Sequence, residues 1–257
     1  MRDRTIVTPY FLERPVPQLG AMARVGWTVN EPVFAGDTAQ VRLAQAHRPI
    51  AAFVAEAIEA GDRPVSIAGD CCAAIGVMAG LQRTGVEATL IWFDAHGDFN
   101  TWETTPSGFL GGMPLAMIVG LGELTMAVAV DLEPHPPERV VLTDGRDLDP
   151  GERELLDGSD VVWLRDPRAL LDQPLPDGPL YIHFDCDVIN ADEAPAHNYP
   201  VPGGPSSADI TAIFTRLAGS GQIVAVSMST WNPDLDEEGG TEAACMACLD
   251  ALLECSD

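Results

Sequence analysis

Two short runs of the sequence place several carboxylates and an imidazole directly after strongly apolar segments. The first run is Asp94-Ala95-His96-Gly97-Asp98, which follows the apolar residues 90–93. The second is Asp185-Cys186-Asp187, which follows the largely apolar residues 180–184. Side chains two residues apart in an extended chain face the same way. We therefore expect the polar side chains within each run to project together.

This combination of side chains is suited to binding metal ions. Four carboxylates at the mouth of one sheet would repel one another, and burial would raise their pKa values until some took up protons. A divalent cation removes that penalty. Oxygen-rich ligand sets with one imidazole suit ions such as Mn²⁺, and these carboxylates with His96 suffice for two ions about 3.5–4 Å apart. Such a pair lowers the pKa of a bridging water and yields a hydroxide that attacks an electrophilic carbon.

The elements that would position these runs alternate between apolar strands and helical patterns. We expect strands at 65–68, 88–93, 139–143, 161–164, 180–184 and 223–228, and helices at 38–60, 73–83, 114–121, 207–219 and 241–254. Such alternation implies right-handed βαβ units and a mainly parallel sheet, whose ligands bind outside the carboxyl ends of the strands. The sequence thus predicts an α/β protein, a single three-layer αβα domain over residues 1–257.

The composition narrows the possible partners. The chain has 39 acidic and 14 basic residues, a net charge of −25, and every basic residue is Arg. The absence of Lys excludes a Schiff-base or phosphate-loop lysine, and the acidic balance argues against nucleic acid. Without an apolar run of about 18 residues or a signal peptide, we expect no membrane association and a cytoplasmic protein that acts on a small molecule. The lone pair Cys245 and Cys248 is interpreted as buried on a helix.

From about residue 65 to 252 the sequence resembles the arginase, or ureohydrolase, family. The specific matches are 94–100 and 183–187, supported by 69–71, 146–149 and 231–233. The resemblance implies an arginase-like fold, two Mn²⁺ ions per chain and a homo-oligomer, either a trimer or a hexamer. It implies that one ion is bound by Asp94, Asp98 and Asp185, and the other by Asp94, His96, Asp185 and Asp187. Asp98 would also handle the proton of the attacking hydroxide.

The same resemblance implies a set of substrate-binding residues. Asn100 and Ser107 match positions that bind the amino-acid end of arginine. Asp149 matches the acid that holds the α-amine, and Glu152 lies nearby in the sequence.

The first departure from the family is Cys71, which stands where the family has a histidine. Cys71 is either a buried thiol or a thiolate metal ligand. As a ligand it would add negative charge, make a metal-bound water less acidic, and shift the preference toward Zn²⁺ or Fe²⁺.

The second departure is Gly111, which occupies the position of a family histidine that shuttles a proton to the leaving amine. His183 and His197 are candidates to replace it. His183 lies two residues before Asp185 and is expected on the same strand face. The alternative for His183 is a core histidine or one that supports a metal ligand.

The third departure is Thr230, where the family has an acid that pairs with the guanidinium. Losing a buried charge-assisted hydrogen bond costs on the order of 1.5–3 kcal/mol, about tenfold to a hundredfold in binding. We therefore expect weak activity on plain arginine. Cys71, the Gly111-Gly112 pair and residues 100–105 together resemble the branch that hydrolyses N-hydroxyarginine.

The leading hypothesis is a binuclear-metal hydrolase that cleaves a linear C–N bond of a guanidino, N-hydroxyguanidino or related amidine substrate by attack of a metal-bridged hydroxide. One alternative is a non-catalytic or single-metal member of the fold with a binding or structural role. A further alternative is a hydrolase of a formimino or ureido substrate.

Overall fold

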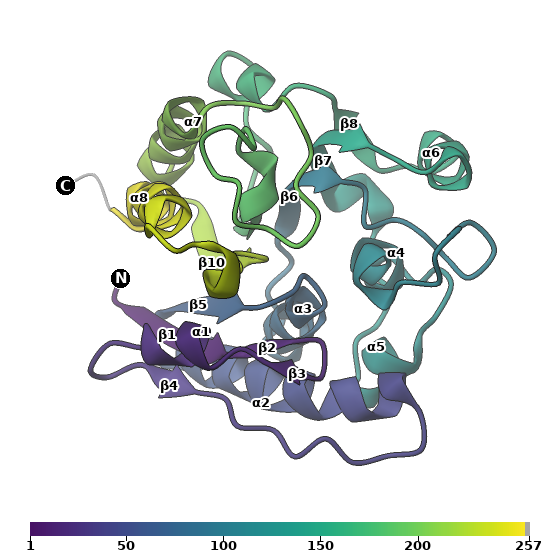
Figure 1. Ribbon diagram of the computed structural model, residues 1–257. Coiled ribbons are helices and arrows are strands. Elements are labelled where there is room, and N and C mark those ends of the chain that lie inside the picture. Colours follow the sequence, from purple (N-terminus) through teal and green to yellow (C-terminus); the bar gives the residue numbers. More distant parts are fainter. Residues whose placement is uncertain (255–257) are drawn as a thin grey trace.

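An eight-stranded sheet forms the middle layer of the protein (Figure 1). The computed structural model describes residues 1–254. From one edge to the other the strands are β4 (Thr28–Val29), β1 (Asp3–Thr8), β5 (Arg63–Ala68), β10 (Ile223–Ser229), β9 (Leu180–Asp185), β6 (Thr89–His96), β7 (Val140–Asp147) and β8 (Val162–Leu164). All neighbouring pairs in this sheet are parallel. A separate two-stranded hairpin is formed by β2 (Tyr10–Phe11) and β3 (Arg14–Pro15).

Helices cover both faces of the sheet. One face packs against α2 (Ala39–Glu59), α3 (Ala73–Arg83), α4 (Pro114–Ile118) and α5 (Thr125–Ala129), and the other against α1 (Pro17–Ala21), α7 (Ser207–Gly219) and α8 (Gly240–Leu253) (Figure 1). The helix α6 (Pro150–Asp157) follows β7. The predicted three-layer arrangement with a mainly parallel sheet is confirmed.

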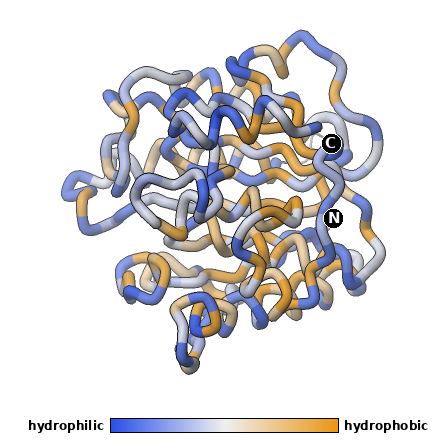
Figure 2. The backbone as a smooth tube through the Cα atoms, turned by 90° about the vertical axis from the view of Figure 1, so that its right-hand side faces the viewer, coloured by the Kyte–Doolittle hydropathy of each residue, from blue (hydrophilic) through white to orange (hydrophobic). Residues whose placement is uncertain are grey.

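Strand β6 shows why the sheet carries two separate hydrophobic cores. Leu90 and Trp92 join the core on the α2–α3 face, whereas Ile91 and Phe93 join the core on the α7–α8 face. Side chains alternate across a strand, so a strand covered on both faces must be apolar at every position. Figure 2 shows the result, with hydrophobic stretches in the interior and largely hydrophilic outer loops. No helix within residues 1–254 is long and apolar enough to cross a membrane.

The expected elements are present, most of them within one or two residues of the predicted ends. Helix α4 ends early, at Ile118. Ser206 caps α7 in a reciprocal box with Asp209, and Cys245 and Cys248 are buried on α8 as interpreted. Cys255 lies outside the described residues.

The sequence analysis missed the N-terminal strands and α1, α5 and α6. Strand β1 takes its place by parallel pairing with β5, a partner about 60 residues away, which no local pattern reveals. Helix α6 did carry a signal, because Asp149, Pro150 and Glu152 form a capping box with proline in the first turn.

Candidate active site

Five adjacent parallel strands bring the predicted site residues to one edge of the sheet. Cys71 follows β5, Thr230 follows β10, Asp185 ends β9, Asp94 lies near the end of β6, and Asp149 follows β7. Cys71, Asp149, Asp185 and Thr230 line a cavity of about 500 Å³. The site therefore lies outside the carboxyl ends of the strands, where open parallel sheets bind their ligands.

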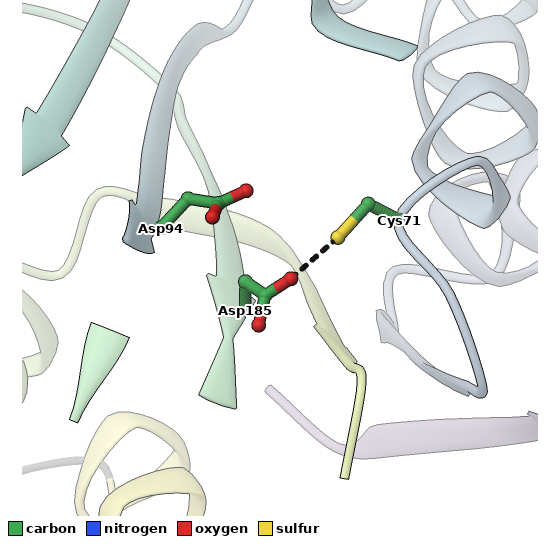
Figure 3. A group of neighbouring side chains, drawn as sticks. All are labelled: Cys71, Asp94 and Asp185. Carbon is green, nitrogen blue, oxygen red and sulfur yellow. Dashed lines mark hydrogen bonds between the residues drawn. The ribbon is translucent and has the colours of Figure 1, made fainter. Parts of the chain in front are cut away.

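The first group of possible metal ligands is Cys71, Asp94 and Asp185, whose ligand atoms all lie within 4.8 Å of one another. Figure 3 shows the Cys71 thiol pointing from its loop toward the Asp185 carboxylate at the end of its strand. The thiol donates to Asp185 Oδ2 at 2.8 Å, and its Sγ lies 3.1 Å from Ser229 Oγ. The Trp92 indole donates to Asp94 Oδ2 at 2.9 Å, which fixes that carboxylate.

The second group is Asp94, His96 and Asp187, again with ligand atoms within 4.8 Å of one another. His96 Nδ1 lies 3.0 Å from Asp187 Oδ2 and 3.4 Å from Asp94 Oδ1. Asp94 belongs to both groups, as expected for a carboxylate that bridges two ions. One expectation is wrong here. Asp187 does not follow Asp185 in extended chain but lies in a short 3-10 turn, Cys186–Val188, which begins with the Asp187 amide donating to Asp185 Oδ1 at 2.8 Å.

Asp98 lies beside these groups with an unpaired oxygen. Its side chain is buried, and its Oδ2 has no hydrogen-bond partner among residues 1–254. Burial, followed by the charges of Asp94 and Asp185, raises the pKa of Asp98 well above its usual value. Its backbone is left-handed, with φ of 48°, a conformation that costs energy for a residue other than glycine. A buried, unpaired carboxylate next to two others is costly unless a cation balances it.

The pKa values within the cluster also indicate a site for cations. Burial, and then the Asp187 charge, raises the pKa of Asp94 to about 6. Burial alone would lower the pKa of His96, but hydrogen bonds to Asp187 and Asp94 outweigh it and raise that pKa to about 12. Without an ion, the cluster thus balances its charge by holding protons. Divalent cations would supply the same positive charge, and carboxylate oxygens, an imidazole and a thiol are suitable donors for them. The residues present fit a pair of metal ions.

His183 lies beneath the site rather than on the cavity wall. Its ring stacks on Trp92 with centroids 3.7 Å apart, and its Nδ1 lies 2.7 Å from Ser227 Oγ. Burial lowers the pKa of His183 to about 3, which keeps the ring neutral. Of the two interpretations given for His183, this placement is that of a core histidine beneath the ligands rather than of a proton donor on the cavity wall. His183 contacts residues that touch the possible metal ligands: Ser229, whose Oγ lies 3.5 Å from His183 Nε2, and Trp92, which donates to Asp94.

His197, the other histidine considered for proton transfer, does line the cavity. It is buried, and its Nδ1 lies 3.3 Å from the Thr230 carbonyl oxygen. Its Nε2 is buried and has no hydrogen-bond partner within the described chain.

The predicted substrate-binding residues all line the cavity, namely Asn100, Ser107, Asp149, Glu152 and Thr230. Asn100 is already engaged, because its amide donates to Asp149 Oδ2 at 3.0 Å and accepts from Thr104 Oγ1 at 2.9 Å. The Thr230 hydroxyl donates to Asp185 Oδ1. Thr230 therefore supports a possible metal ligand instead of offering an acid to a guanidinium.

Glu152 has a structural task as well. It accepts hydrogen bonds from the Phe99 amide at 2.8 Å and the Asp149 amide at 3.1 Å. Burial raises the pKa of Glu152 to about 7. Its carboxyl group thus joins the start of α6 to the loop that carries Asp98.

Sequence reasoning missed the part played by Arg146, which it used only as part of a family motif. The Arg146 guanidinium pairs with Asp144 and donates to the carbonyl oxygens of Asp187 at 3.0 Å, Val188 at 3.1 Å and Val201 at 3.0 Å. One cation therefore fixes both the turn that carries Asp187 and the loop that follows it. The same reasoning gave no role to three aromatic side chains on the cavity wall, Phe11, Phe109 and Tyr199, because nothing in the local sequence indicates that they meet.

A parallel sheet with two groups of ion ligands at its carboxyl edge is the arrangement of a metal-dependent hydrolase. The arginase family model matches residues 20–254. An N(omega)-hydroxy-L-arginine amidinohydrolase of Streptomyces lavendulae is 32% identical over 85% of this chain and 80% of its own length. An arginase of Bacillus caldovelox is 31% identical over 82% of this chain and 75% of its own length. The crystal structure of the Bacillus subtilis arginase superposes with a TM-score of 0.83 at 26% identity, covering 98% of both chains.

The chain belongs to the arginase family. It is a metal-dependent hydrolase that acts on C–N bonds.

Proposed function

We propose that the protein is a binuclear-metal hydrolase that cleaves a linear C–N bond of a guanidino or N-hydroxyguanidino compound and releases urea or hydroxyurea. One observation carries the proposal. Two ligand groups share Asp94 beside the unpaired, buried Asp98. That pattern provides for two ions and for a base next to them.

The ions, Mn²⁺ being the expected metal, would be held by residues of both groups. By the family resemblance, Cys71, Asp94, Asp98 and Asp185 would hold one ion, and Asp94, His96, Asp185 and Asp187 the other. The clustering of Cys71 with Asp94 and Asp185, and of His96 with Asp94 and Asp187, supports this assignment. When bound, the two ions supply a water acidic enough to act as a nucleophile near neutral pH. The unpaired Oδ2 of Asp98 then takes up and holds the proton of the attacking water.

The surroundings of the scissile group favour an N-hydroxyguanidine over a guanidine. Thr230 is neutral and its hydroxyl donates to Asp185, so this position offers no acid to pair with a cationic guanidinium. An N-hydroxyguanidine is less basic and depends less on such a partner. His197 lines the cavity, but burial lowers its pKa and its Nδ1 faces the Thr230 carbonyl oxygen, so the neutral ring carries no proton on Nε2 for a departing amine. A substrate whose leaving group needs less acid help fits this site better. The similarity to the Streptomyces lavendulae amidinohydrolase supports this preference.

The test is hydrolysis by the purified, Mn²⁺-loaded protein of arginine, N-hydroxyarginine, agmatine, 4-guanidinobutyrate and formiminoglutamate. We expect the N-hydroxyguanidine to be turned over faster than the guanidine with the same tail. The Asp98→Asn variant, with its metal content measured alongside, is the matched control and should be inactive. A protein that binds no metal and hydrolyses none of these compounds supports the non-catalytic alternative. Arginine turnover at ordinary arginase rates contradicts the argument from Thr230 and Gly111.

A further inference from the structure

Three aromatic side chains meet on the wall of the cavity, and we call Phe11, Phe109 and Tyr199 the aromatic rim. Phe11 and Phe109 are stacked, with centroids 6.1 Å apart and planes 20° apart. Phe109 and Tyr199 have centroids 5.2 Å apart at a tilt of 55°. Tyr199 is 53% exposed, which places this end of the rim at the cavity mouth.

The rim is held by the same segments that carry the metal ligands. Phe11 lies on the β2–β3 hairpin, which is fastened to the Cys71 loop because the Leu12 amide donates to Asp70 Oδ2 at 2.7 Å. Gly69 completes this contact, since a Cβ there would lie 2.2 Å from the Tyr10 carbonyl oxygen.

The loop that carries Tyr199 is fixed on both sides. The Asn232 amide donates to Asn198 Oδ1 at 2.8 Å, and Arg146 donates to the Val201 carbonyl at 3.0 Å. The aromatic rim is therefore a built wall of the cavity, positioned relative to the metal ligands.

Two of the polar groups expected to hold the carboxylate of an amino-acid end, Asn100 and Ser107, are hydrogen-bonded to neighbouring side chains or backbone. The side-chain nitrogen of Asn100 donates to Asp149, and its side-chain oxygen accepts from Thr104. Ser107 Oγ accepts from the Phe109 amide at 3.2 Å and lies 3.3 Å from Thr105 Oγ1. No Arg or Lys is among the described residues that line the cavity, whereas the exposed Asp147 is. A carboxylate on the substrate tail would meet negative charge and no cation.

Given the proposed hydrolysis, on which this inference rests, we propose that the substrate of this cavity carries an uncharged apolar or aromatic tail that packs on the aromatic rim, in place of a free α-amino-acid end. The cavity volume of about 500 Å³ leaves room for a tail beyond the small guanidine group. Aromatic side chains provide large apolar area and a preferred stacking geometry for such a tail. Phe109 and Tyr199 are then the residues that determine specificity.

The experiment compares four guanidines that share a four-carbon linker: butylguanidine, 4-phenylbutylguanidine, agmatine and 5-guanidinopentanoate. Their affinities for the Mn²⁺-loaded protein are measured by calorimetry, and their hydrolysis is measured separately. We expect the phenyl compound to bind about 10- to 100-fold more tightly than butylguanidine, since its ring leaves water, and the carboxylate to bind most weakly. Tyr199→Ala and Phe109→Ala should remove most of the phenyl preference. Trp27→Ala, which changes an aromatic residue outside the cavity lining, should keep it.

Each outcome decides one of the two proposals. Equal affinity for the phenyl and butyl compounds, or a preference that survives Tyr199→Ala and Phe109→Ala, overturns the role of the aromatic rim. If agmatine binds most tightly and Tyr199→Ala or Phe109→Ala removes that preference, the aromatic rim recognises a cation. That result overturns the proposal of an uncharged tail. Hydrolysis without phenyl preference overturns only this inference. Phenyl preference in binding, with hydrolysis neither of these guanidines nor of N-hydroxyarginine, overturns the proposed function but leaves the packing of the tail on the aromatic rim in place.

Discussion

The ring of Phe109 lies over Gly111, so that a Cβ built on Gly111 would be only 2.4 Å from two of the ring carbons. Real Cβ atoms do not come so close to other atoms. The missing side chain at residue 111 and the aromatic ring beside it are therefore one feature of the cavity. The apolar ring of Phe109 fills the space that a side chain at residue 111 would occupy.

This contact predicts the effect of restoring a histidine. Gly111→His should destabilise the protein by about 1–3 kcal/mol, because the new side chain overpacks against the Phe109 ring. The double change Phe109→Ala with Gly111→His should recover much of that loss, since the ring has been removed. Urea denaturation of the single and double variants measures both values. Equal destabilisation in the two backgrounds would show that the ring moves aside without cost.

The unpaired Asp98 predicts a stability effect whose sign depends on metal. In chelator-treated protein, Asp98→Asn should raise the free energy of unfolding by about 1–3 kcal/mol, because it removes a buried carboxyl from beside Asp94 and Asp185. In Mn²⁺-loaded protein the same change should lower stability, since a ligand to the ion is lost. Urea denaturation with chelator and with excess Mn²⁺ gives the two values, with Asp172→Asn as an exposed control. If Asp98→Asn lowered the free energy of unfolding under both conditions, the charges of Asp94 and Asp185 would not be destabilising the Asp98 carboxyl.

Thr230 predicts how the preference between substrates can be changed. Thr230→Glu places a carboxylate on the cavity wall and should improve kcat/KM for a guanidine by about tenfold to a hundredfold relative to the N-hydroxyguanidine with the same tail. The left-handed backbone, with φ of 69°, is no worse for Glu than for the β-branched Thr.

The neutral variant Thr230→Gln is the matched control for this change and should not shift the ratio. Steady-state kinetics on the pair of substrates measures it. The same shift in both variants would assign the effect to side-chain size rather than to charge.

His47 predicts a loss of stability in mild acid that is independent of the metal site. Burial lowers the pKa of His47 from 6.5 to about 4. Between these values the unfolded chain binds a proton that the folded protein does not, so this contribution is complete above about pH 6.5 and is lost as the pH falls toward 4. The shift corresponds to about 3 kcal/mol.

His47→Gln, which does not titrate, should flatten the pH dependence of the unfolding free energy by about 2 kcal/mol between pH 7 and 4.5, the remainder of the effect falling below that range. All other titrating groups are common to both proteins, so the difference isolates this residue. Parallel stability curves for the two proteins would contradict the prediction.

The sequence by itself determined the central strands, most of the helices and the carboxylates at the strand ends. These features follow from local rules. Residues 90–93 are apolar at every position because β6 is covered on both faces, and charged groups such as Asp94 are tolerated only where that strand leaves the core. The motif around Asp94 and Asp185 therefore indicated the site before any distance was known.

Only the tertiary structure decided which side chains face the cavity and what else they contact. His183 is two residues from Asp185, yet it stacks on Trp92 in the core, whereas His197 reaches the cavity from a distant loop. Phe11 and Phe109 are about 100 residues apart and meet because a hairpin is fastened to the Cys71 loop. Periodicity along the chain fixes the face on which a side chain lies, but contacts between loops depend on packing over long sequence separations, which no local pattern encodes.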